Sequence, residues 1–490
     1  MGQIKTMGRH TMVYGAGVVL GKLASFIMLP VYTRYLTPSD YGVLELLAMT
    51  IEVIGTVAGV GLASSVFKFY ADASGREEKN TVIGTAAISA AALAAVATVL
   101  GLLASPLLSR LVLGEQGDPA YFRIFFLIYF LQNFEYVPLM LMRAQNRSRL
   151  FVSLNVAKLV VMLGLNIYFV VYLRQGVMGV LTSNLITSTL LAVGLTAYMV
   201  RSVGLRFSLG RFLSMARYGN PMILWSLGTF VLVFADRFFL NHYTDTATVG
   251  IYSLAYKFAF ILTAFAYRPF RMVWEPQRFE IAKRPDAAEV FARIFLYMNV
   301  VVGGMALVLT LFVRDFLSLM SAPAFRPAYT LVPVLVAAQI LFIWVSYCNL
   351  ALFVKSKTPV MAAVAVVGVA ATLLLNFLLI PRFGMYGAAL ATFLAYGLRF
   401  VLIFRTAQRH YPIPYGWLAV ARLYAILGTA VALRFVVQPD ALVASLAWSA
   451  ALLLGAAGLV YLQVLGPRER VVVRGFLGRA RTFRFRPALG

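Results

Sequence analysis

Long apolar runs separated by short polar connectors repeat along the whole sequence. Each run holds about 20 residues, enough for an α-helix to cross the hydrocarbon core of a bilayer. A transmembrane barrel would instead show alternating segments of about ten residues. The pattern therefore predicts an all-α, polytopic membrane protein in which no connector is long enough to form a separate soluble domain. The predicted helices are fourteen, near residues 12–33, 42–69, 81–105, 122–142, 150–173, 177–199, 219–240, 249–272, 290–313, 328–354, 359–380, 386–407, 417–437 and 441–465.

The second part of the chain repeats landmarks of the first. The segment Arg174–Gly179 (RQGVMG) is echoed 208 residues later by Arg382–Gly387 (RFGMYG), and both copies fall at predicted turns. The same offset relates three further pairs, Gly42 with Gly250, Arg147 with Lys355 and Arg149 with Lys357. Six crossings return a chain to the same side of the membrane, so a duplicated six-helix unit gives two parallel repeats, as in several transporter folds.

This duplication predicts the domain organisation. We expect one lobe at residues 1–205 and a second at 206–410, arranged around a central cavity. Two further helices at 411–465 lie outside the repeat, and a basic tail follows at 466–490. The echoed segments are interpreted as hinge or packing elements between helices, whereas the chemistry of the protein is expected in the cavity.

Composition and charge support a membrane protein and add an orientation. Hydrophobic residues make up 61% of the chain, above the 45–50% apolar content that is usual in soluble domains. The net charge is +25, and Lys and Arg concentrate in alternate connectors, a distribution that marks the cytoplasmic side. Both termini are therefore predicted in the cytoplasm, and the basic tail is expected to touch anionic lipid headgroups rather than nucleic acid. The single cysteine, Cys348, excludes a disulfide within the chain.

Ionisable side chains inside predicted spans are costly in a membrane and therefore indicate function. Among the basic ones, the candidates for binding substrate in a cationic cavity are Lys22, Arg34, Lys158, Arg237, Lys257, Arg268 and Arg399. The acidic ones, candidates for coupling to H⁺ or Na⁺, are Glu45, Glu52, Glu135 and Asp236. Because basic groups outnumber acidic ones, a cavity built from them would be cationic and would bind an anion, with phosphate favoured by the chemistry of Lys and Arg.

Packing roles compete with these functional ones. Arg34 could cap its helix or pair with Asp40, and Asp236 with Arg237 could serve helix packing alone. Lys257 and Arg268 are eleven residues apart, so on an unbroken α-helix they share a face. The sequence shows none of three patterns that would indicate catalysis or cofactor binding: a metal-ligand cluster, a Gly-rich phosphate loop or a nucleophile triad. We therefore expect a protein that is not an enzyme and has no catalytic residue, metal site or cofactor.

Several motifs together resemble the Wzx-type polysaccharide-transporter flippases of bacteria. They are Leu29–Leu36 (LPVYTRYL) before Tyr41-Gly42, Asp236–Leu240 (DRFFL) before Val249–Ser253 (VGIYS), Lys355–Pro359 (KSKTP), and Leu375-Asn376 followed by Leu379–Pro381 (LIP) and Gly384–Ala389 (GMYGAA). This family belongs to the multidrug/oligosaccharidyl-lipid/polysaccharide exporter superfamily, which also holds lipid II flippases and drug extruders. Each motif alone is modest, and their order along the chain carries the resemblance.

The resemblance implies a flippase of the bacterial cytoplasmic (inner) membrane that works by alternating access. Its substrate would be an undecaprenyl-diphosphate-linked oligosaccharide, a repeat unit of O-antigen lipopolysaccharide, capsule or exopolysaccharide, moved from the inner to the outer leaflet. Membrane lipids, a glycan polymerase and a chain-length regulator are the implied partners. The resemblance implies that basic cavity residues meet the diphosphate or acidic sugars. Arg34 matches such a position here, and Lys22 lies on the same predicted helix.

Four other functions remain as alternatives at this point. Lipid II flipping is compatible with the same cationic cavity, because its carrier is also a polyprenyl diphosphate. A drug extruder is disfavoured by the two additional helices and by the basic cavity, since those proteins usually have twelve spans and move cations. A membrane glycan polymerase or ligase needs a reactive outer loop, and the longest outer connector, residues 106–121, shows no acid–base pair. A scaffolding role in a synthase complex would leave the chain without a substrate of its own.

Overall fold

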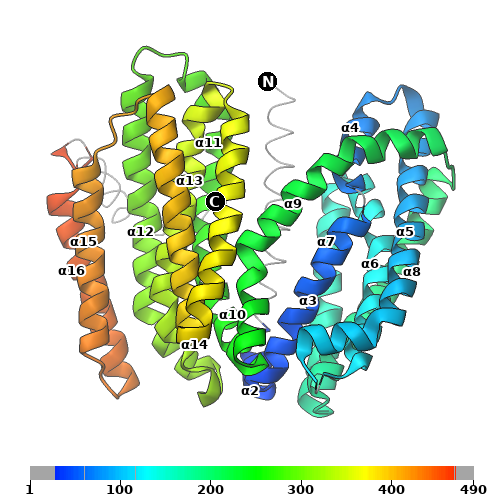
Figure 1. The fold of residues 1–490 in the computed structure, drawn as a ribbon, viewed down its shortest axis with the longest axis horizontal. Helices are drawn as coiled ribbons and strands as arrows, with labels where there is room; N and C mark the ends of the chain where they lie inside the picture. The colour runs from blue at the N-terminus through cyan, green and yellow to red at the C-terminus, as the bar shows by residue number, and fades with distance from the viewer. Residues whose placement is uncertain (1–27, 60, 116, 468, 471–490) are drawn as a thin grey trace, which may run out of the picture. The chain divides into compact units, whose positions relative to one another are not determined.

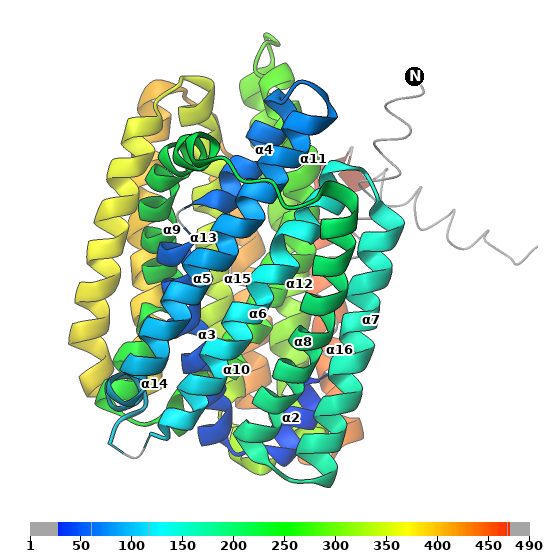
Figure 2. The same ribbon diagram turned by 90° about the vertical axis from the view of Figure 1, so that its right-hand side faces the viewer.

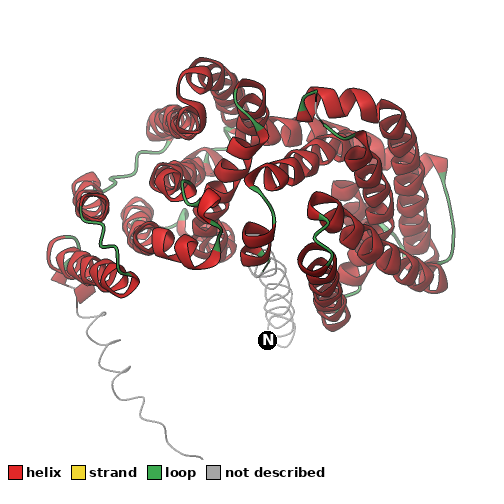
Figure 3. Cartoon of the chain, turned by 90° about the horizontal axis from the view of Figure 1, so that it is seen from below, coloured by secondary structure: helices red, strands yellow, loops and turns green. Residues whose placement is uncertain are grey.

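The structure is a computed structural model that describes residues 28–59, 61–115, 117–467 and 469–470. Within these residues every regular element is a helix (Figure 3). Twelve of the described helical segments are long and apolar enough to cross a membrane. The predicted all-α membrane architecture is therefore confirmed.

The chain divides into two compact units. Unit 1 comprises residues 1–254, 320–325 and 369–391, and unit 2 comprises 255–319, 326–368 and 392–490. The lobe boundaries predicted from the sequence stay a prediction.

The helices before residue 254, labelled in Figure 1, belong to unit 1. Their bounds are α2 Leu29–Tyr35, α3 Pro38–Ala58, α4 Leu62–Asp72, α5 Gly75–Leu113, α6 Pro119–Ala144, α7 Ser148–Asn166, the π-helix η1 Ile167–Tyr172, α8 Gly176–Val203 and α9 Leu209–Tyr243. The helix α10, Thr246–Ile261, begins in unit 1 and continues into unit 2.

The later helices build most of unit 2. Their bounds are the π-helix η2 Leu262–Tyr267, α11 Arg268–Ile281, α12 Ala287–Met320, the 3₁₀ turn η3 Pro323–Phe325, α13 Ala328–Val354, α14 Thr358–His410, α15 Trp417–Val436 and α16 Leu442–Gln463. Residues 320–325 and the middle of α14, residues 369–391, belong to unit 1 instead.

Two of the predicted spans are merged in α14. The backbone at Gly384 departs from helical geometry with φ 53° and ψ −130°, and the helix kinks there. The two parts of α14 then run back past each other, because a Cβ at Gly368 would lie 2.4 Å from Cδ of Arg399. The predicted spans 359–380 and 386–407 are thus both present. The first predicted span, 12–33, lies mostly outside the described residues, which hold only its end as α2.

The prediction of one unbroken helix over 42–69 is wrong. The helix α3 starts four residues earlier, where Thr37 and Asp40 form a capping box and Pro38 fixes the first turn. It ends at Ala58, and α4 begins after Gly61, whose φ is +63°. A Cβ at Gly61 would lie 2.2 Å from the carbonyl oxygen of Gly219. The break therefore lets the backbones of α4 and α9 touch, which a continuous helix with larger residues would prevent.

Local backbone geometry supports the duplication. Gly176 and Gly384, 208 residues apart, both have positive φ, 55° and 53°. The residues three positions later are also glycines in tight places. A Cβ at Gly179 would lie 3.0 Å from the oxygen of Phe169, and one at Gly387 would lie 2.3 Å from the oxygen of Leu379. The echoed segments are thus turn and packing elements, as their sequence predicts.

The offset is not constant along the repeat, which corrects two sequence pairings, Arg147 with Lys355 and Arg149 with Lys357. Before α7 the amide of Arg147 donates to the oxygen of Met142 at 2.8 Å, and before α14 that of Lys357 donates to Leu352 at 2.8 Å. The structural equivalent of Arg147 is therefore Lys357, 210 residues later, and not Lys355. The π-helix η1 follows α7 in the first copy, and its wider turns absorb additional residues, which explains the return to an offset of 208 at Gly176.

The two copies also meet each other inside unit 1. A Cβ at Gly42 would lie 1.9 Å from the oxygen of Thr246, and one at Gly250 would lie 2.0 Å from the oxygen of Pro38. Gly42 and Gly250 are 208 residues apart, as are Pro38 and Thr246, so each contact is the repeat image of the other. Residues beside this crossing add a 2.6 Å hydrogen bond between the hydroxyls of Ser39 and Thr246. The start of α3 thus packs on the start of α10 around a local two-fold arrangement.

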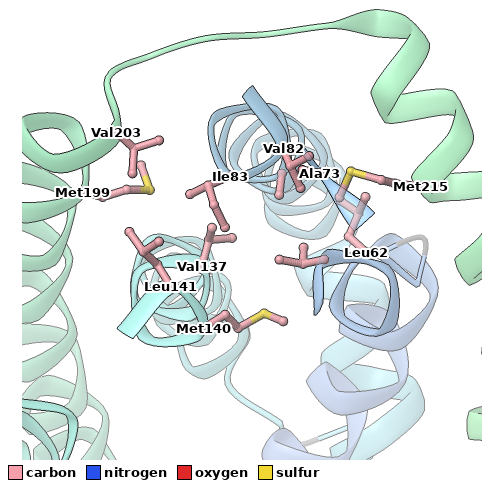
Figure 4. Packing of buried hydrophobic residues seen from close by; sticks show 12 residues of the cluster. Leu62, Ala73, Val82, Ile83, Val137, Met140, Leu141, Met199, Val203 and Met215 are labelled. Atoms are coloured by element: carbon pink, nitrogen blue, oxygen red, sulfur yellow. The ribbon is translucent and has the colours of Figure 1, made fainter. Parts of the chain in front are cut away.

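The rest of unit 1 packs as neighbouring long helices. Figure 2 shows α5, α6, α8 and α7 side by side, and α6 makes extensive contacts with both α5 and α8. At one end of these helices a buried cluster brings together α4, α5, α6, α8 and α9 (Figure 4). Ile83, Leu141 and Met199 are each at most 4% exposed within it. This cluster, called here the end cluster, fixes the helix ends relative to one another.

Candidate functional site

A cavity with a volume of about 620 Å³ lies within unit 1. This size falls within the range of about 300–1,000 Å³ that is usual for ligand sites. Its walls come from α3, α4, α5, α6 and α9 and from the connector between α3 and α4. The polar and aromatic side chains that line it are Glu52, Thr56, Phe125, Tyr129, Gln132, Asn133, Tyr136 and Ser226.

Helical spacing places these side chains on the cavity. On α3 the lining positions Ala48, Glu52, Gly55 and Gly59 recur every three or four residues, which is one face of a helix. On α6 the lining positions 125, 129, 132, 133 and 136 follow the same rule. Glu45 continues the face of α3 by one more turn but does not line the cavity.

The cavity offers hydrogen-bonding groups and aromatic faces. The side-chain amide nitrogen of Asn133 donates to the carbonyl oxygen of Tyr129 at 2.8 Å, which orients the side-chain oxygen of Asn133. A Cβ at Gly55 would lie 3.0 Å from the ring of Tyr129, so the absence of a side chain there lets the ring sit against α3. Glu52 contributes the one charge among the lining residues. The groups present suit hydroxyl-rich, uncharged ligands or a cation.

None of the predicted basic residues that the structure describes lines this cavity. Lys158, on α7, instead pairs with Glu135, on α6, at 2.6 Å. The carboxylate is buried, whereas the ammonium group is partly exposed. Burying a carboxylate in a helix bundle is costly unless a cation compensates it, so this pair holds α6 and α7 together.

Asp236 and Arg237 form a second buried group. One amino group of Arg237 donates to Asp236 at 2.6 Å and to the oxygen of Val233 at 2.5 Å. The hydroxyl of Tyr252 donates to the other oxygen of Asp236 at 2.5 Å. Both charged side chains are at most 4% exposed. This group joins α9 to the first part of α10, next to the crossing of Gly42 and Gly250.

The remaining predicted site residues lie in different surroundings. Arg34 is exposed at the end of α2, and Lys257 is half-buried on α10. Arg268 is exposed and stacks over the ring of Phe260 at 5.3 Å. The π-helix η2 lies between Lys257 and Arg268, so the shared face expected on an unbroken α-helix does not apply to them. Arg399 is half-buried, and Lys22 lies outside the described residues. The substrate-binding role of these residues stays a prediction.

A buried charged network in unit 2 was not predicted from the sequence. Arg434, on α15, lies 3.3 Å from both carboxylate oxygens of Asp315, on α12, and donates to Ser445 at 2.7 Å. The hydroxyl of Ser445, on α16, donates to Asp315 at 2.5 Å. Asp315 falls just beyond the predicted end of its helix at 313, but α12 continues to Met320. The boundary error therefore hid a carboxylate that lies inside the helix.

Comparison with solved structures finds several proteins of similar fold. The chain is similar to the lipid II flippase MurJ in an inward closed conformation, with a TM-score of 0.73 and 10% identity over 92% of this chain and 99% of that one. A multidrug resistance MATE family transporter of the MOP superfamily, facing inward, matches with a TM-score of 0.63 and 15% identity over 79% and 94%. The Vibrio cholerae MATE transporter VcmN, in a mutant form, matches with 0.54 and 18% over 83% and 97%.

These identities are low, so the structural likeness establishes the fold alone. Comparison with curated proteins gave no sequence match. The family model described as polysaccharide biosynthesis protein matches residues 7–282, which is more than half of the chain. That region includes the first predicted motif, Leu29–Leu36, and the second, Asp236–Leu240. The resemblance that these motifs carry is therefore confirmed, and the chain belongs to the polysaccharide biosynthesis protein family.

Proposed function

We propose that the chain is a flippase for an undecaprenyl-diphosphate-linked oligosaccharide. It would carry the repeat unit of a surface polysaccharide from the inner to the outer leaflet of a bacterial cytoplasmic membrane by alternating access. Membership of the polysaccharide biosynthesis family carries this proposal, and a fold similar to a lipid II flippase over 92% of the chain supports it.

The cavity of unit 1 supports a glycan as the cargo. Tyrosine rings such as Tyr129 and Tyr136 offer flat apolar faces, and the amides of Gln132 and Asn133 offer donors and acceptors. Sugar rings need both, because they present C–H faces and hydroxyl edges. We propose that this cavity holds sugar units, while the polyprenyl chain stays in the surrounding lipid.

The diphosphate needs cations, and the predicted ones remain the candidates. We propose that Lys22, Arg34, Lys257 and Arg268 bind it during transport. Arg34 and Arg268 are exposed on their helices, so packing does not enclose either side chain. Lys158 and Arg237 are less suited, because each already compensates a buried carboxylate.

A flipping assay in proteoliposomes tests the proposed substrate and the proposed diphosphate-binding cations. Purified protein would be reconstituted with a fluorescent undecaprenyl-diphosphate oligosaccharide, and flipping measured by accessibility to an added lectin or hydrolase. The variants Lys257→Glu and Arg268→Glu should lose at least about tenfold in rate, since each replaces attraction for the diphosphate by repulsion. Arg405→Glu, an exposed cation of the same unit, should flip at the normal rate. Normal flipping by both of the first two variants would overturn the assignment of the cations.

Lipid II is the second candidate substrate, because a lipid II flippase has a similar fold with a TM-score of 0.73. Presenting lipid II in the same proteoliposomes separates the two. Flipping of lipid II with no flipping of the oligosaccharide carrier would replace the proposed substrate, and polymerisation of the oligosaccharide by the purified protein would assign an enzyme instead. A glycan polymerase and a chain-length regulator remain the proposed partners in the cell.

A further inference from the structure

A second cavity, of about 400 Å³, opens at one end of the helices of unit 1. Its walls come from the end of α4, the start of α5, the connector between α6 and α7 and the end of α8. Four of its lining residues are cations, Arg76, Lys79, Arg147 and Arg201, and they define what is called here the basic pocket. It shares no lining residue with the larger cavity.

The charge of this basic pocket is not compensated within the described part of the chain. No carboxylate lines it, and none of its four cations forms an ion pair with a described residue. The two nearest acids in sequence, Glu77 and Glu78, pair instead with Arg206 and Arg211. Four like charges around one cavity repel each other, and a bound anion would relieve that repulsion.

The polar groups of the pocket are held in place by packing. The guanidinium of Arg147 donates to the hydroxyl of Tyr198 at 2.6 Å, and Lys79 lies over the ring of Tyr70 at 5.4 Å. Both tyrosines pack against the end cluster, whose core is drawn in Figure 4. The side-chain oxygen of Gln145 is buried and accepts no hydrogen bond from a described residue. Rotation of this amide would present its NH₂ group to an anion as a further donor.

From helix length, we expect the pocket at the depth of lipid headgroups. The helix α6 has 26 residues and is therefore about 39 Å long, longer than the ~30 Å hydrocarbon core. The ends of α6 and α8 thus reach the headgroup region, where phosphate groups are abundant. The basic connectors of this end also predict the cytoplasmic side, whose leaflet carries anionic lipid.

We propose that the basic pocket binds a phosphate-bearing anion, and that this site is separate from the larger cavity of unit 1. Its size admits more than one phosphate group, and its guanidinium groups can each donate two parallel hydrogen bonds to phosphate oxygens. The ligand is either the headgroup of an anionic lipid or a soluble diphosphate. This inference does not rest on the proposed transport function, because its test measures binding alone.

The test compares two double variants of the full-length protein that remove equal charge. Arg76→Gln/Arg201→Gln removes two cations of the pocket, and Arg149→Gln/Arg217→Gln removes two exposed cations of the same unit that do not line it. In the first arm, inorganic pyrophosphate is titrated into protein held in nanodiscs of zwitterionic phosphatidylcholine, and binding is measured by calorimetry. In the second, nanodiscs contain phosphatidylglycerol or cardiolipin, and native mass spectrometry measures the anionic lipid retained after release into detergent.

We expect the pocket variant to lose at least about tenfold in affinity or retention in one of the two arms, since a charge-assisted hydrogen bond is lost with each cation. The control variant should behave as the unmodified protein. A loss confined to the pyrophosphate arm assigns a soluble diphosphate, and a loss confined to the lipid arm assigns a headgroup. Equal behaviour of the pocket and control variants in both arms would overturn the proposal, because the four cations would then act only as unspecific charge.

Discussion

At the residue scale, the buried charges of the described helices act in groups. The pairs Lys158 with Glu135 and Arg434 with Asp315 each join neighbouring helices, and hydroxyl groups complete the second pair. In a bilayer interhelical polar links are worth only about 0.6–2 kcal/mol each, because the separated groups also find other partners in the membrane. Removing one member costs more than the link is worth, since the other member stays buried and charged.

The Arg434 network gives a prediction about stability. Arg434→Gln should lower the free energy of unfolding in detergent by about 3–5 kcal/mol, since it leaves Asp315 buried without a cation. The double variant Arg434→Gln/Asp315→Asn should recover part of this loss because it removes the stranded charge. Thermal unfolding of the purified protein measures both. Arg422→Gln changes an exposed arginine of the same helix α15 and serves as the control, and a loss of similar size there would contradict the prediction.

Glu52 gives a prediction about energy coupling. It is the one charged side chain that lines the cavity of unit 1, and we propose that it exchanges a proton during transport. The Glu52→Gln variant should then lose the dependence of flipping on a pH gradient, which is worth about tenfold per pH unit for each coupled proton. Flipping in proteoliposomes with and without a gradient measures this. Glu45 lies on the same face of α3 but does not line the cavity. The Glu45→Gln variant should therefore keep the dependence of flipping on the pH gradient.

The sequence revealed Lys158, Glu135 and the pair Asp236-Arg237 as charged residues inside spans, but not the network of Arg434 and Asp315, and it did not reveal what any of them contacts. Composition alone shows that Lys158 and Glu135 are unusual in apolar surroundings, whereas their pairing depends on the packing of α7 against α6. Gln132 and Asn133 carry no comparable signal, because uncharged amides are common in membrane helices. Their place on a cavity follows only from the helical face that they share with Tyr129 and Tyr136.

At the element scale, close helix crossings depend on glycine where backbones touch. The crossing of α3 and α10 at Gly42 and Gly250 brings a position for a Cβ within 2.0 Å of a carbonyl oxygen on each side. No rotamer change relieves such a contact, because both partners are backbone atoms. Small residues at helix contacts are the usual device of membrane bundles.

Gly42→Ala should therefore destabilise the protein by about 1–3 kcal/mol, as overpacking does in well-packed interiors. Gly304→Ala, in the interior of α12, meets nothing within 4 Å and should be neutral or stabilising by up to about 1 kcal/mol. Midpoints of thermal unfolding for the two variants would be compared. The double variant Gly42→Ala/Gly250→Ala should cost less than the sum of the single ones, because both methyl groups open the same crossing. Equal midpoints for Gly42→Ala and Gly304→Ala would contradict this account.

Helix number and order followed from hydrophobic periodicity, but helix breaks did not. The apolar run through residues 42–69 hides the break at Gly61 because its hydropathy is that of a continuous span, although Gly55, Gly59 and Gly61 weaken the helix there. Only the backbone of Gly219, far along the chain, requires it. The π-helix η1 likewise leaves no apolar signature, although it explains why the offset between the two copies returns from 210 to 208 residues at Gly176.

At the scale of the whole molecule, the distribution of basic residues predicts the orientation of the protein in the membrane, which helix packing alone does not determine. Helix length and hydropathy identify the segments that can span a membrane, but they do not show which end of each helix faces the cytoplasm. Basic residues do, because Lys and Arg are retained on the cytoplasmic side during insertion. The start of α7, which holds Arg149, is predicted on the cytoplasmic side, and the turn at Gln175 is predicted on the outer side. The proposed orientation can therefore be tested at two points near the opposite ends of α7 and η1.

The single cysteine makes this test direct. Cys348 is buried, so a membrane-impermeant maleimide should label the unmodified protein weakly in intact cells. Arg149→Cys and Gln175→Cys each place one thiol at an exposed position. Gln175→Cys should be labelled in intact cells, and Arg149→Cys only after the membrane is permeabilised, with at least about tenfold contrast, because the reagent cannot cross the hydrocarbon core. The reverse labelling pattern would show that the protein has the opposite orientation in the membrane. The basic pocket and the tail would then face outward, where neither a cytoplasmic diphosphate nor the anionic inner leaflet could reach them.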